Sequence, residues 1–174
     1  MIKAKYPAIV FIAVLIFAIV IPIIYYPKMP AQVASHFNAS GNADGWSTRN
    51  SFLLIQIATT IFTALIFGIC GFFVTKFPKS MMNIPNKDYW LSEEKKEETY
   101  ILFQKFLFWF GSMTLGFVTL VFMEALRANL DGSKSMGENF WIYLGVFLLF
   151  TFYYSIKFVL YFRKKNIPQE TGKS

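Results

Sequence analysis

Residues 8–26 read AIVFIAVLIFAIVIPIIYY, a run of 19 residues without a charged side chain. Residues 52–74 and 106–123 are also free of charge, and residues 140–162 contain only Lys157. A transmembrane helix needs about 20 mainly apolar residues to cross a hydrocarbon core about 30 Å thick. Because only helices and closed barrels satisfy their backbone groups in lipid, these runs predict an all-α integral membrane protein with four transmembrane helices. The predicted helices cover residues 7–26, 51–76, 93–127 and 139–163.

The composition favours a single membrane domain over residues 1–174. Apolar residues make up 55% of the chain and aromatic residues 20%, which exceeds the usage of soluble domains. The first apolar run could be a signal peptide, but it is longer than the usual apolar region of about 7–15 residues, and no Ala-x-Ala cleavage site follows it. Cys70 lies alone in an apolar run, so we expect it to be a packing residue.

The distribution of basic residues predicts the orientation. Of the 17 Lys and Arg residues, 13 lie at the N-terminus, in residues 76–105 and at the C-terminal end. Cytoplasmic loops carry the Lys and Arg excess. We therefore expect both termini and the inner loop 77–92 in the cytoplasm, with outer loops 27–50 and 128–138 on the other side. The net charge of +7 is thus explained by topology and by contact with an anionic lipid bilayer, and no motif indicates nucleic-acid binding.

The inner loop joins turn-forming and aromatic residues to a charged stretch. Residues 83–91 (NIPNKDYWL) predict an irregular segment with interfacial aromatic side chains. Ser92 is a suitable helix cap, so the third helix should begin near Glu93 and extend into the cytoplasm. The candidate cytoplasmic contact residues are Asn83, Pro85, Asn86, Asp88, Tyr89 and Trp90.

Small residues recur along one face of two predicted helices. In the second helix they are Thr60, Ala64, Gly68 and Gly71, and Ser112 and Gly116 have the same spacing in the third. Such positions let helices approach closely in lipid. Packing within one chain is the favoured interpretation, and a homodimer seam is the alternative.

The outer loop 27–50 holds the only histidine of the chain. Gly41 and Gly45 can adopt positive φ, and Asn42 and Asp44 can bond to nearby backbone in turns. Two compatible interpretations follow: a compact, self-bonded cap, or a surface that recognises a partner. The candidate partner-binding or loop-structuring residues are Pro30, His36, Phe37, Asn38, Gly41, Asp44, Gly45 and Trp46. Within this set, His36 could pin the loop or titrate near neutral pH, and Trp46 suits an interfacial anchor.

Charged residues at the outer end of the third helix form a second candidate group. Glu124 and Arg127 are three residues apart, so they can pair across one helical turn, and Asn129 follows. We expect structural pairing, with support of an outer-face site as the alternative.

The sequence offers little for catalysis, and we expect neither a metal nor another cofactor. Catalytic zinc usually has three protein ligands, whereas the outer face offers only His36, Asp44 and Glu124. Ser35, His36 and Asp44 are nominally a hydrolytic triad, but adjacent Ser and His side chains rarely point toward each other. Enzymatic activity is therefore the least favoured hypothesis.

The outer loop and its flanking helices also resemble a known family. The string Tyr26-Pro27-x-x-Pro30…His36-Phe37-Asn38-x-x-Gly41-x-x-Asp44-Gly45-Trp46 is similar to the signature of a bacterial membrane domain of unknown function. That domain forms the N-terminal part of the immunity proteins against the sporulation-delaying toxin. The resemblance covers about residues 8–75, and the chain has Val33-Ala34 where the family usually has Ile-Pro. It implies a location in the bacterial cytoplasmic membrane.

Two functional hypotheses follow. The first is a non-enzymatic sensor, immunity-like or accessory protein, whose outer loop recognises an extracellular peptide or a membrane partner. The second is a transporter subunit that works as a homo-oligomer or in a larger complex, because four helices with few polar groups make a poor solitary pore.

Overall fold

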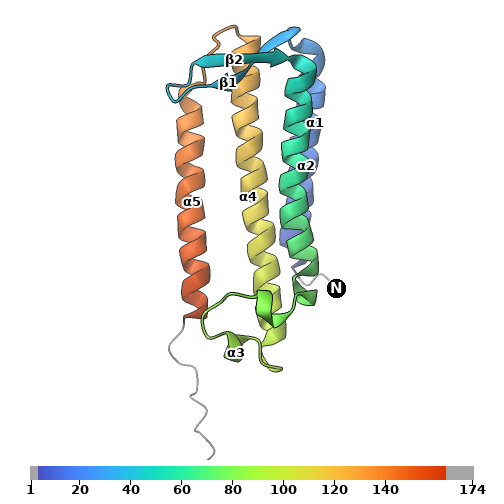
Figure 1. Ribbon diagram of the computed structural model, residues 1–174, viewed down its shortest axis with the longest axis vertical. Helices are drawn as coiled ribbons and strands as arrows, with labels where there is room; N and C mark the ends of the chain where they lie inside the picture. The colour runs from blue at the N-terminus through green and yellow to red at the C-terminus, as the bar shows by residue number, and fades with distance from the viewer. Residues whose placement is uncertain (1–3, 164–174) are drawn as a thin grey trace, which may run out of the picture.

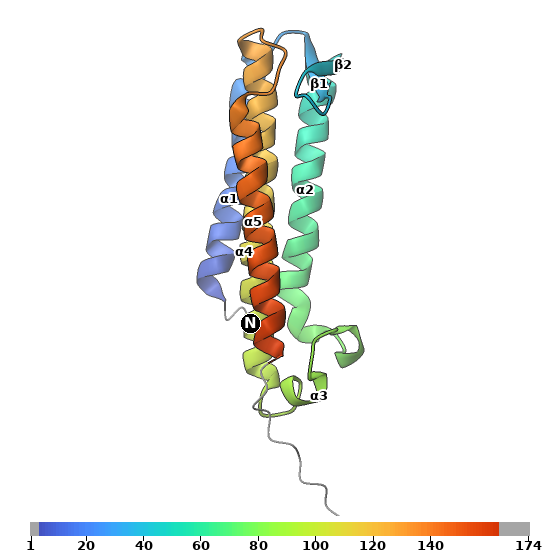
Figure 2. The same ribbon diagram turned by 90° about the vertical axis from the view of Figure 1, so that its left-hand side faces the viewer.

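Four long helices run side by side along the long axis of the molecule (Figures 1 and 2). The computed structural model describes residues 4–163. All four helices are long and apolar enough to cross a membrane, which is the architecture of a multi-pass membrane protein. The predicted four helices of membrane-spanning length and apolar composition are therefore confirmed within these residues.

The helix boundaries follow local signals. Helix α1 (Lys5–Tyr25) contains Pro22 in its last turn, and the N–H of Tyr26 donates to the Pro22 carbonyl. Helix α2 (Arg49–Phe73) begins after Thr48, whose hydroxyl accepts a hydrogen bond from the Ser51 N–H. The other two long helices are α4 (Lys96–Leu130) and α5 (Glu138–Phe162).

Helix α4 is the centre of the bundle. It packs against α1, α2 and α5, whereas α5 has its main contact with α4. The α4–α5 seam is built from stacked rings, with centroids 4.0 Å apart for Phe106–Phe158 and 4.3 Å apart for Phe117–Phe147. Most of α5 is thus turned away from the protein, in a position to face lipid.

The small residues of α2 pack within the chain. All four are buried, and a Cβ at Gly71 would lie 2.8 Å from the Phe108 ring of α4. In α4 the closely packed glycine is Gly111, not the predicted Gly116, which has no atom within 4 Å of its hypothetical Cβ. The stripe on α2 therefore supports the favoured interpretation, packing between helices of one chain.

A β-hairpin corrects the prediction of an all-α chain. Strand β1 (Gln32–Phe37) pairs antiparallel with β2 (Ala43–Thr48), and the hairpin lies across one end of the bundle (Figure 1). Pairs such as Val33–Ser47 are regular, but the register shifts between Ala34 and Phe37. The strands contain Ala, Ser, Asp and Gly, which have low strand propensity, so the local sequence gave no strand signal.

The opposite end, called here the α3 end, consists of short elements. Two 3₁₀ turns, Val74–Lys76 and Lys79–Met81, precede the one-turn helix α3 (Lys87–Trp90). Helix α4 then begins at Lys96 rather than near Glu93. The Ser92 side chain does not cap it; instead, the Ser92 carbonyl accepts hydrogen bonds from the N–H groups of Lys95 and Lys96. A turn bonded through this carbonyl therefore replaces the predicted first helical turn.

Candidate functional site

Asn129 fixes the hairpin to the bundle. Its Oδ1 accepts a hydrogen bond of 2.6 Å from the Ala34 N–H, and its Nδ2 donates to the Ala34 carbonyl at 2.9 Å. The same Nδ2 donates to the Ala125 carbonyl one turn earlier in α4. The Asn129 side chain is 4% exposed and Ala34 is 1% exposed. The Asn129 side-chain amide thus satisfies both backbone groups of Ala34, as a neighbouring strand would. Asn129 therefore supports the hairpin from α4.

The hairpin turn is closed by Asn38 and Gly41. The Asn38 side-chain oxygen accepts hydrogen bonds from the N–H groups of Ser40 and Asn42. Gly41 has φ +81°, a conformation that L-residues with a side chain rarely adopt. Asn38, rather than Asn42, therefore supplies the side-chain bonds of this turn.

The α4–α5 loop pairs with the hairpin. The N–H of Met136 donates to the Gly41 carbonyl at 2.8 Å, and the N–H of Ala43 donates to the Lys134 carbonyl at 2.9 Å. Hairpin, loop and the end of α4 thus form one hydrogen-bonded unit, called here the cap (residues 29–48 and 129–137). The predicted compact and self-bonded outer loop has this structure.

His36 and Asp44 are paired across the hairpin. The His36 Nδ1 lies within hydrogen-bond distance of Asp44 Oδ1, and the two side chains are 74% and 44% exposed. Gly45 is opposite His36 in the register, and a Cβ there would lie 2.9 Å from the His36 Cβ. Gly45 therefore provides room for the histidine, and it does not have the positive φ expected for it.

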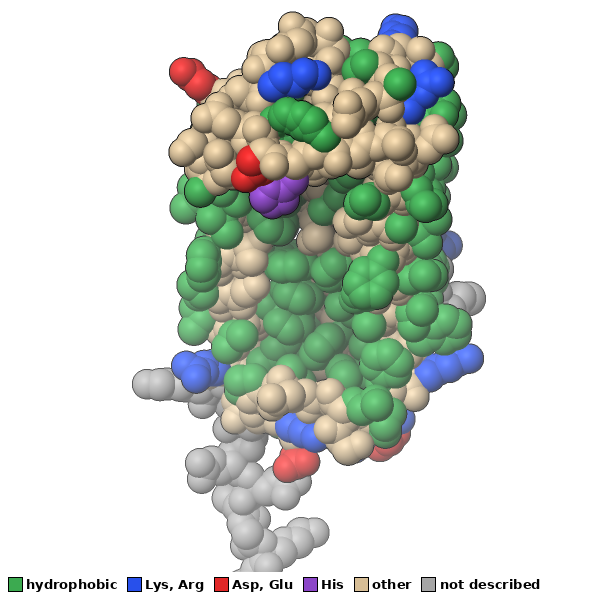
Figure 3. All heavy atoms as spheres, turned by 45° about the horizontal axis from the view of Figure 1, so that its top comes forward, with side chains coloured by type: hydrophobic (Ala, Val, Ile, Leu, Met, Phe, Trp, Pro, Cys, Tyr) green, Lys and Arg blue, Asp and Glu red, His purple; other side chains and the backbone are tan. Residues whose placement is uncertain are grey.

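The remaining outer-loop candidates divide between surface and core. Trp46 is 45% exposed on β2, and Pro30 is exposed just before β1. Phe37 is half-buried against the cluster that includes Met29, Val33 and Phe52. Charged and histidine side chains gather on this end of the molecule, above a largely hydrophobic flank (Figure 3).

The predicted Glu124–Arg127 pair is present and belongs to a larger cluster. The Arg127 guanidinium donates to Glu124 at 3.0 Å, to Asp131 at 2.6 Å and to the Ser135 carbonyl at 3.2 Å. Glu124 is buried, with a side chain 7% exposed. Gly137 packs on the pair so closely that a Cβ would lie 2.8 Å from an Arg127 nitrogen. The arginine thus ties α4 to the α4–α5 loop.

An open groove of about 350 Å³ lies beside this ionic cluster. Two acids and one arginine line it together with Tyr25 and Tyr143 and four apolar side chains. The groove therefore offers a polar side and an apolar side at the end of the bundle that carries the cap.

Within the described residues, His36 and Asp44 form a pair rather than part of a larger group of metal-ligating side chains. Within residues 4–163, no group of three or more His, Cys, Asp and Glu side chains is placed to hold a metal ion. His36 pairs with Asp44, and no hydrogen bond joins its ring to Ser35 in this part of the chain. The nominal triad is therefore not assembled.

Asp131 makes the loop sensitive to acid. Its pKa is held below the usual range, first because Ser133 donates hydrogen bonds to the carboxylate, and second because Arg127 lies beside it. A lowered pKa contributes stability that is present above the ordinary value near pH 4 and is lost as pH falls through the lower value of the folded state.

We expect the protection factor of the Ser133 amide, its exchange rate relative to the intrinsic rate at each pH, to fall only below about pH 4, the ordinary range of an aspartate. Hydrogen exchange against pH measures this, and Asp131→Asn should remove the transition. A midpoint at or above the ordinary aspartate value would contradict the assignment.

Some of the predicted cytoplasmic contact residues pack against the bundle, and others lie on the surface. Asn86, with φ 54°, donates from Nδ2 to the Phe162 carbonyl at 2.9 Å, and the Trp90 indole donates to the same oxygen at 3.1 Å. Tyr89 packs against this cluster and Pro85 is half-buried, whereas Asn83 and Asp88 are exposed. The segment therefore caps the C-terminus of α5, and Asn83 and Asp88 stay free on its surface.

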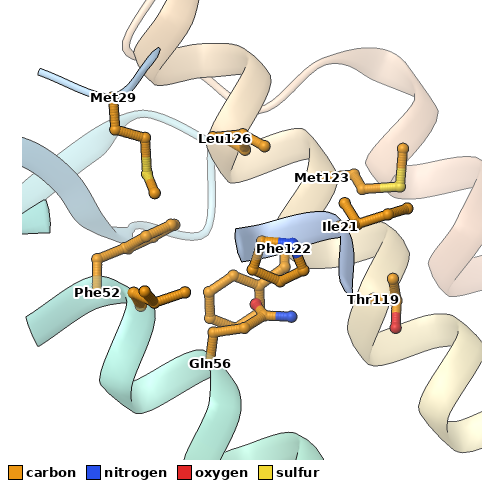
Figure 4. Close-up of a pocket in the computed structure, with 10 residues that line it drawn as sticks. Ile21, Met29, Phe52, Gln56, Thr119, Phe122, Met123 and Leu126 are labelled. Atoms are coloured by element: carbon orange, nitrogen blue, oxygen red, sulfur yellow. The ribbon is translucent and has the colours of Figure 1, made fainter. Parts of the chain in front are cut away.

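Gln56 is a polar residue that the sequence analysis did not single out. It is fully buried in α2, and neither its amide oxygen nor its amide nitrogen has a hydrogen-bond partner within residues 4–163. The Thr60 hydroxyl, one turn further along, is also without a partner there. Figure 4 shows the Gln56 amide among Ile21, Thr119 and Phe122 of the neighbouring helices. In the sequence, Gln56 could have been noticed as a single amide residue within an otherwise apolar run.

The space beside Gln56 is small. Its volume of about 10 Å³ is close to what a single water needs, and its lining is otherwise mainly apolar. An unpaired buried amide is costly, since it loses its bonds to water without replacement.

Gln56→Leu is expected to stabilise the protein by about 1 kcal/mol, because it removes an unpaired polar group at similar volume. Thermal unfolding in detergent measures this. Gln104→Leu is the matched control in α4: Gln104 is equally buried but has a partner, so its loss should destabilise. Destabilisation by Gln56→Leu would instead point to a bound water or another bonded partner.

The comparisons with known proteins give one match. The family described as "Domain of unknown function (DUF1648)" matches residues 13–60. These residues include most of α1, the whole hairpin and the first half of α2. Searches of curated proteins and of solved structures found no match. The matched region thus covers the cap's hairpin and the adjoining parts of the two helices that flank it in the chain, but not Asn129 or the α4–α5 loop.

Proposed function

We propose that this chain is a non-enzymatic protein of the bacterial cytoplasmic membrane whose cap recognises an extracellular peptide or a membrane partner. The observation that carries the proposal is a rigid backbone with exposed polar and aromatic side chains. Asn129 and the α4–α5 loop hold the hairpin, and His36, Asp44 and Trp46 project from it. Binding residues are commonly presented in this way, on loops fixed by a rigid scaffold.

The groove beside the cap supports the same role. It places Glu124 and Asp131 beside tyrosines and apolar side chains. A peptide with basic and apolar residues would find both kinds of contact there. Tyrosine and arginine are also enriched among the residues that contribute most to interfaces.

The proposed orientation puts the cap outside the cell. Residues 27–50 and 127–138 contain four Lys and Arg, against 13 at the α3 end and the termini. This asymmetry is that of a protein with its basic loops in the cytoplasm.

Orientation is tested with single cysteines. In a Cys70→Ala background, Ser40→Cys should react with a membrane-impermeant maleimide on intact cells, and Asn83→Cys should react only after lysis. The reverse labelling pattern would place the cap in the cytoplasm and contradict the proposed orientation.

The resemblance to immunity proteins narrows the proposed role to sensing or self-protection. The match to residues 13–60 lies in the region that carries the resemblance. We therefore expect the chain to protect its own cell, or to report on its surroundings, through a peptide at the cap.

Survival of a deletion strain in spent medium of its own species tests this role. Three versions of the gene are restored separately: wild type, His36→Ala/Trp46→Ala, and Gln32→Ala. Gln32 is an exposed β1 residue outside the His36–Asp44 pair, so its variant is the matched control. Rescue by wild type and the control, but not by the double variant at equal membrane abundance, would support recognition at the cap. Equal survival of all strains would exclude self-immunity.

The alternative of a transporter subunit has one observation in its favour. Gln56 and Thr60 are buried polar residues of α2, and their side chains have no hydrogen-bond partner within residues 4–163. Intramembrane polar residues often mark transport pathways. A single monomeric species in mild detergent would count against this alternative, because the chain alone is a poor pore.

A further inference from the structure

We propose that the α4–α5 seam, at the α3 end, binds the phosphate head group of an anionic phospholipid through Lys105 and Lys157. The two lysines line one groove of about 230 Å³. Lys105 comes from α4 and Lys157 from α5, so only the packing of the two helices brings them together. The rest of the lining is apolar or aromatic, and it includes Trp109 and Phe158.

Ring stacking fixes the two lysines at the same level. Phe106 stacks on Tyr154 and Phe158, with centroids 5.2 Å and 4.0 Å apart. Lys105 immediately precedes Phe106, and Lys157 immediately precedes Phe158. The two lysines therefore start from about the same level on the two helices that form the groove.

Both ammonium groups lack an acidic partner. Within residues 4–163, neither Lys105 nor Lys157 is in an ion pair, and both are exposed. Lys157 donates to the Tyr153 hydroxyl at 3.2 Å. The nearby acid, Glu98, already accepts from Tyr161 at 2.9 Å and pairs with Lys95 at 3.2 Å. The groove thus carries uncompensated positive charge.

The position of the groove selects a lipid as the ligand. Lys157 is five residues before the end of α5, which corresponds to about 7.5 Å along a helix. A lysine at this depth can extend to the head groups while its stem stays in the apolar layer, once its ammonium leaves the Tyr153 hydroxyl that it bonds in this structure. Basic pockets between transmembrane helices bind acidic lipid head groups, and the apolar walls suit an acyl chain. The inference depends neither on the cap's partner nor on the orientation.

Lipid titration of the full chain tests the site. The protein is purified in neutral detergent, and phosphatidylglycerol binding is followed by native mass spectrometry. Lys105→Gln or Lys157→Gln should weaken binding roughly fivefold each, and the double variant about 30-fold. Lys105→Arg/Lys157→Arg keeps both positive charges and should bind the lipid like wild type. This result would show that the glutamine variants bind weakly because they lose charge, not because they misfold.

The control variant removes two positive charges from another part of the α3 end. Lys76→Gln/Lys79→Gln removes two exposed lysines outside the groove. Unaltered binding by this variant supports a defined site, and an equal loss would overturn it in favour of general electrostatics. Equal binding of phosphatidylcholine would also overturn it. Displacement of the lipid by millimolar inorganic phosphate would reassign the groove to free phosphate.

Discussion

Replacing Asn129 with alanine is expected to lower the free energy of unfolding by about 3 kcal/mol and to release the hairpin from the bundle. The amide makes both hydrogen bonds of the buried Ala34 backbone. Without it, the Ala34 N–H and carbonyl are left unpaired in an apolar setting, and each such group costs about 1–3 kcal/mol. Thermal unfolding in detergent measures the total loss, and hydrogen exchange at residues 32–48 measures the local release.

Asn139→Ala is the matched control. Asn139 lies in the first turn of α5, is exposed, and makes no side-chain hydrogen bond among the described residues. Its removal should change stability by less than about 0.5 kcal/mol. If the Asn129 variant were as stable as this control, and its hairpin as protected from exchange, the hydrogen bonds between Asn129 and Ala34 (the Asn129 clamp) would have no structural role.

The second large effect is expected for Gly111→Ala, which should destabilise the bundle by about 2–3 kcal/mol. A Cβ at Gly111 would lie 2.7 Å from the Phe67 Cβ and 2.8 Å from the Phe11 ring. The first of these atoms is held close to the backbone, so a rotamer change cannot relieve the contact. Helices α1 and α2 would then have to move away from α4.

Gly116→Ala provides the comparison on the same helix. Nothing lies within 4 Å of its hypothetical Cβ, so the added methyl meets open space. Because alanine is the better helix former, this variant should be neutral or more stable by up to about 1 kcal/mol. Chemical unfolding of both variants in one detergent decides the matter. Equal effects at the two positions would mean that α4 does not pack as described.

The structure around the candidate recognition residues was only partly predictable from sequence. Turn chemistry indicated a compact outer loop, and residue spacing indicated the Glu124–Arg127 pair. The roles of individual residues were harder to assign. Gly45 was expected to supply positive φ, but its role is to make room for His36 opposite it, and Asp44 bonds that histidine rather than the backbone. Such roles depend on which residue lies opposite on the paired strand. The sequence of one strand does not determine that pairing register.

The distant contacts could not be predicted at all. Asn129 is 95 positions from Ala34, and Trp90 is 72 positions from the Phe162 carbonyl that it caps. Both side chains stood out in the sequence as polar or aromatic residues in loops. Their bonding partners are backbone groups, which carry no sequence signal.

By itself, the sequence determined four helices long and apolar enough to cross a membrane, because runs of 18 or more residues with at most one charge can satisfy their backbone groups in lipid as helices. It also determined which loops are polar and which are basic. Only the tertiary structure decided that residues 32–48 form a hairpin, since their weak strand propensity is overcome by the Asn129 clamp and the pairing with residues 134–136. The burial of the Gln56 amide without a partner among residues 4–163, and the placement of two lysines along one α4–α5 groove, also depend on tertiary structure, because helix packing sets which side chains meet.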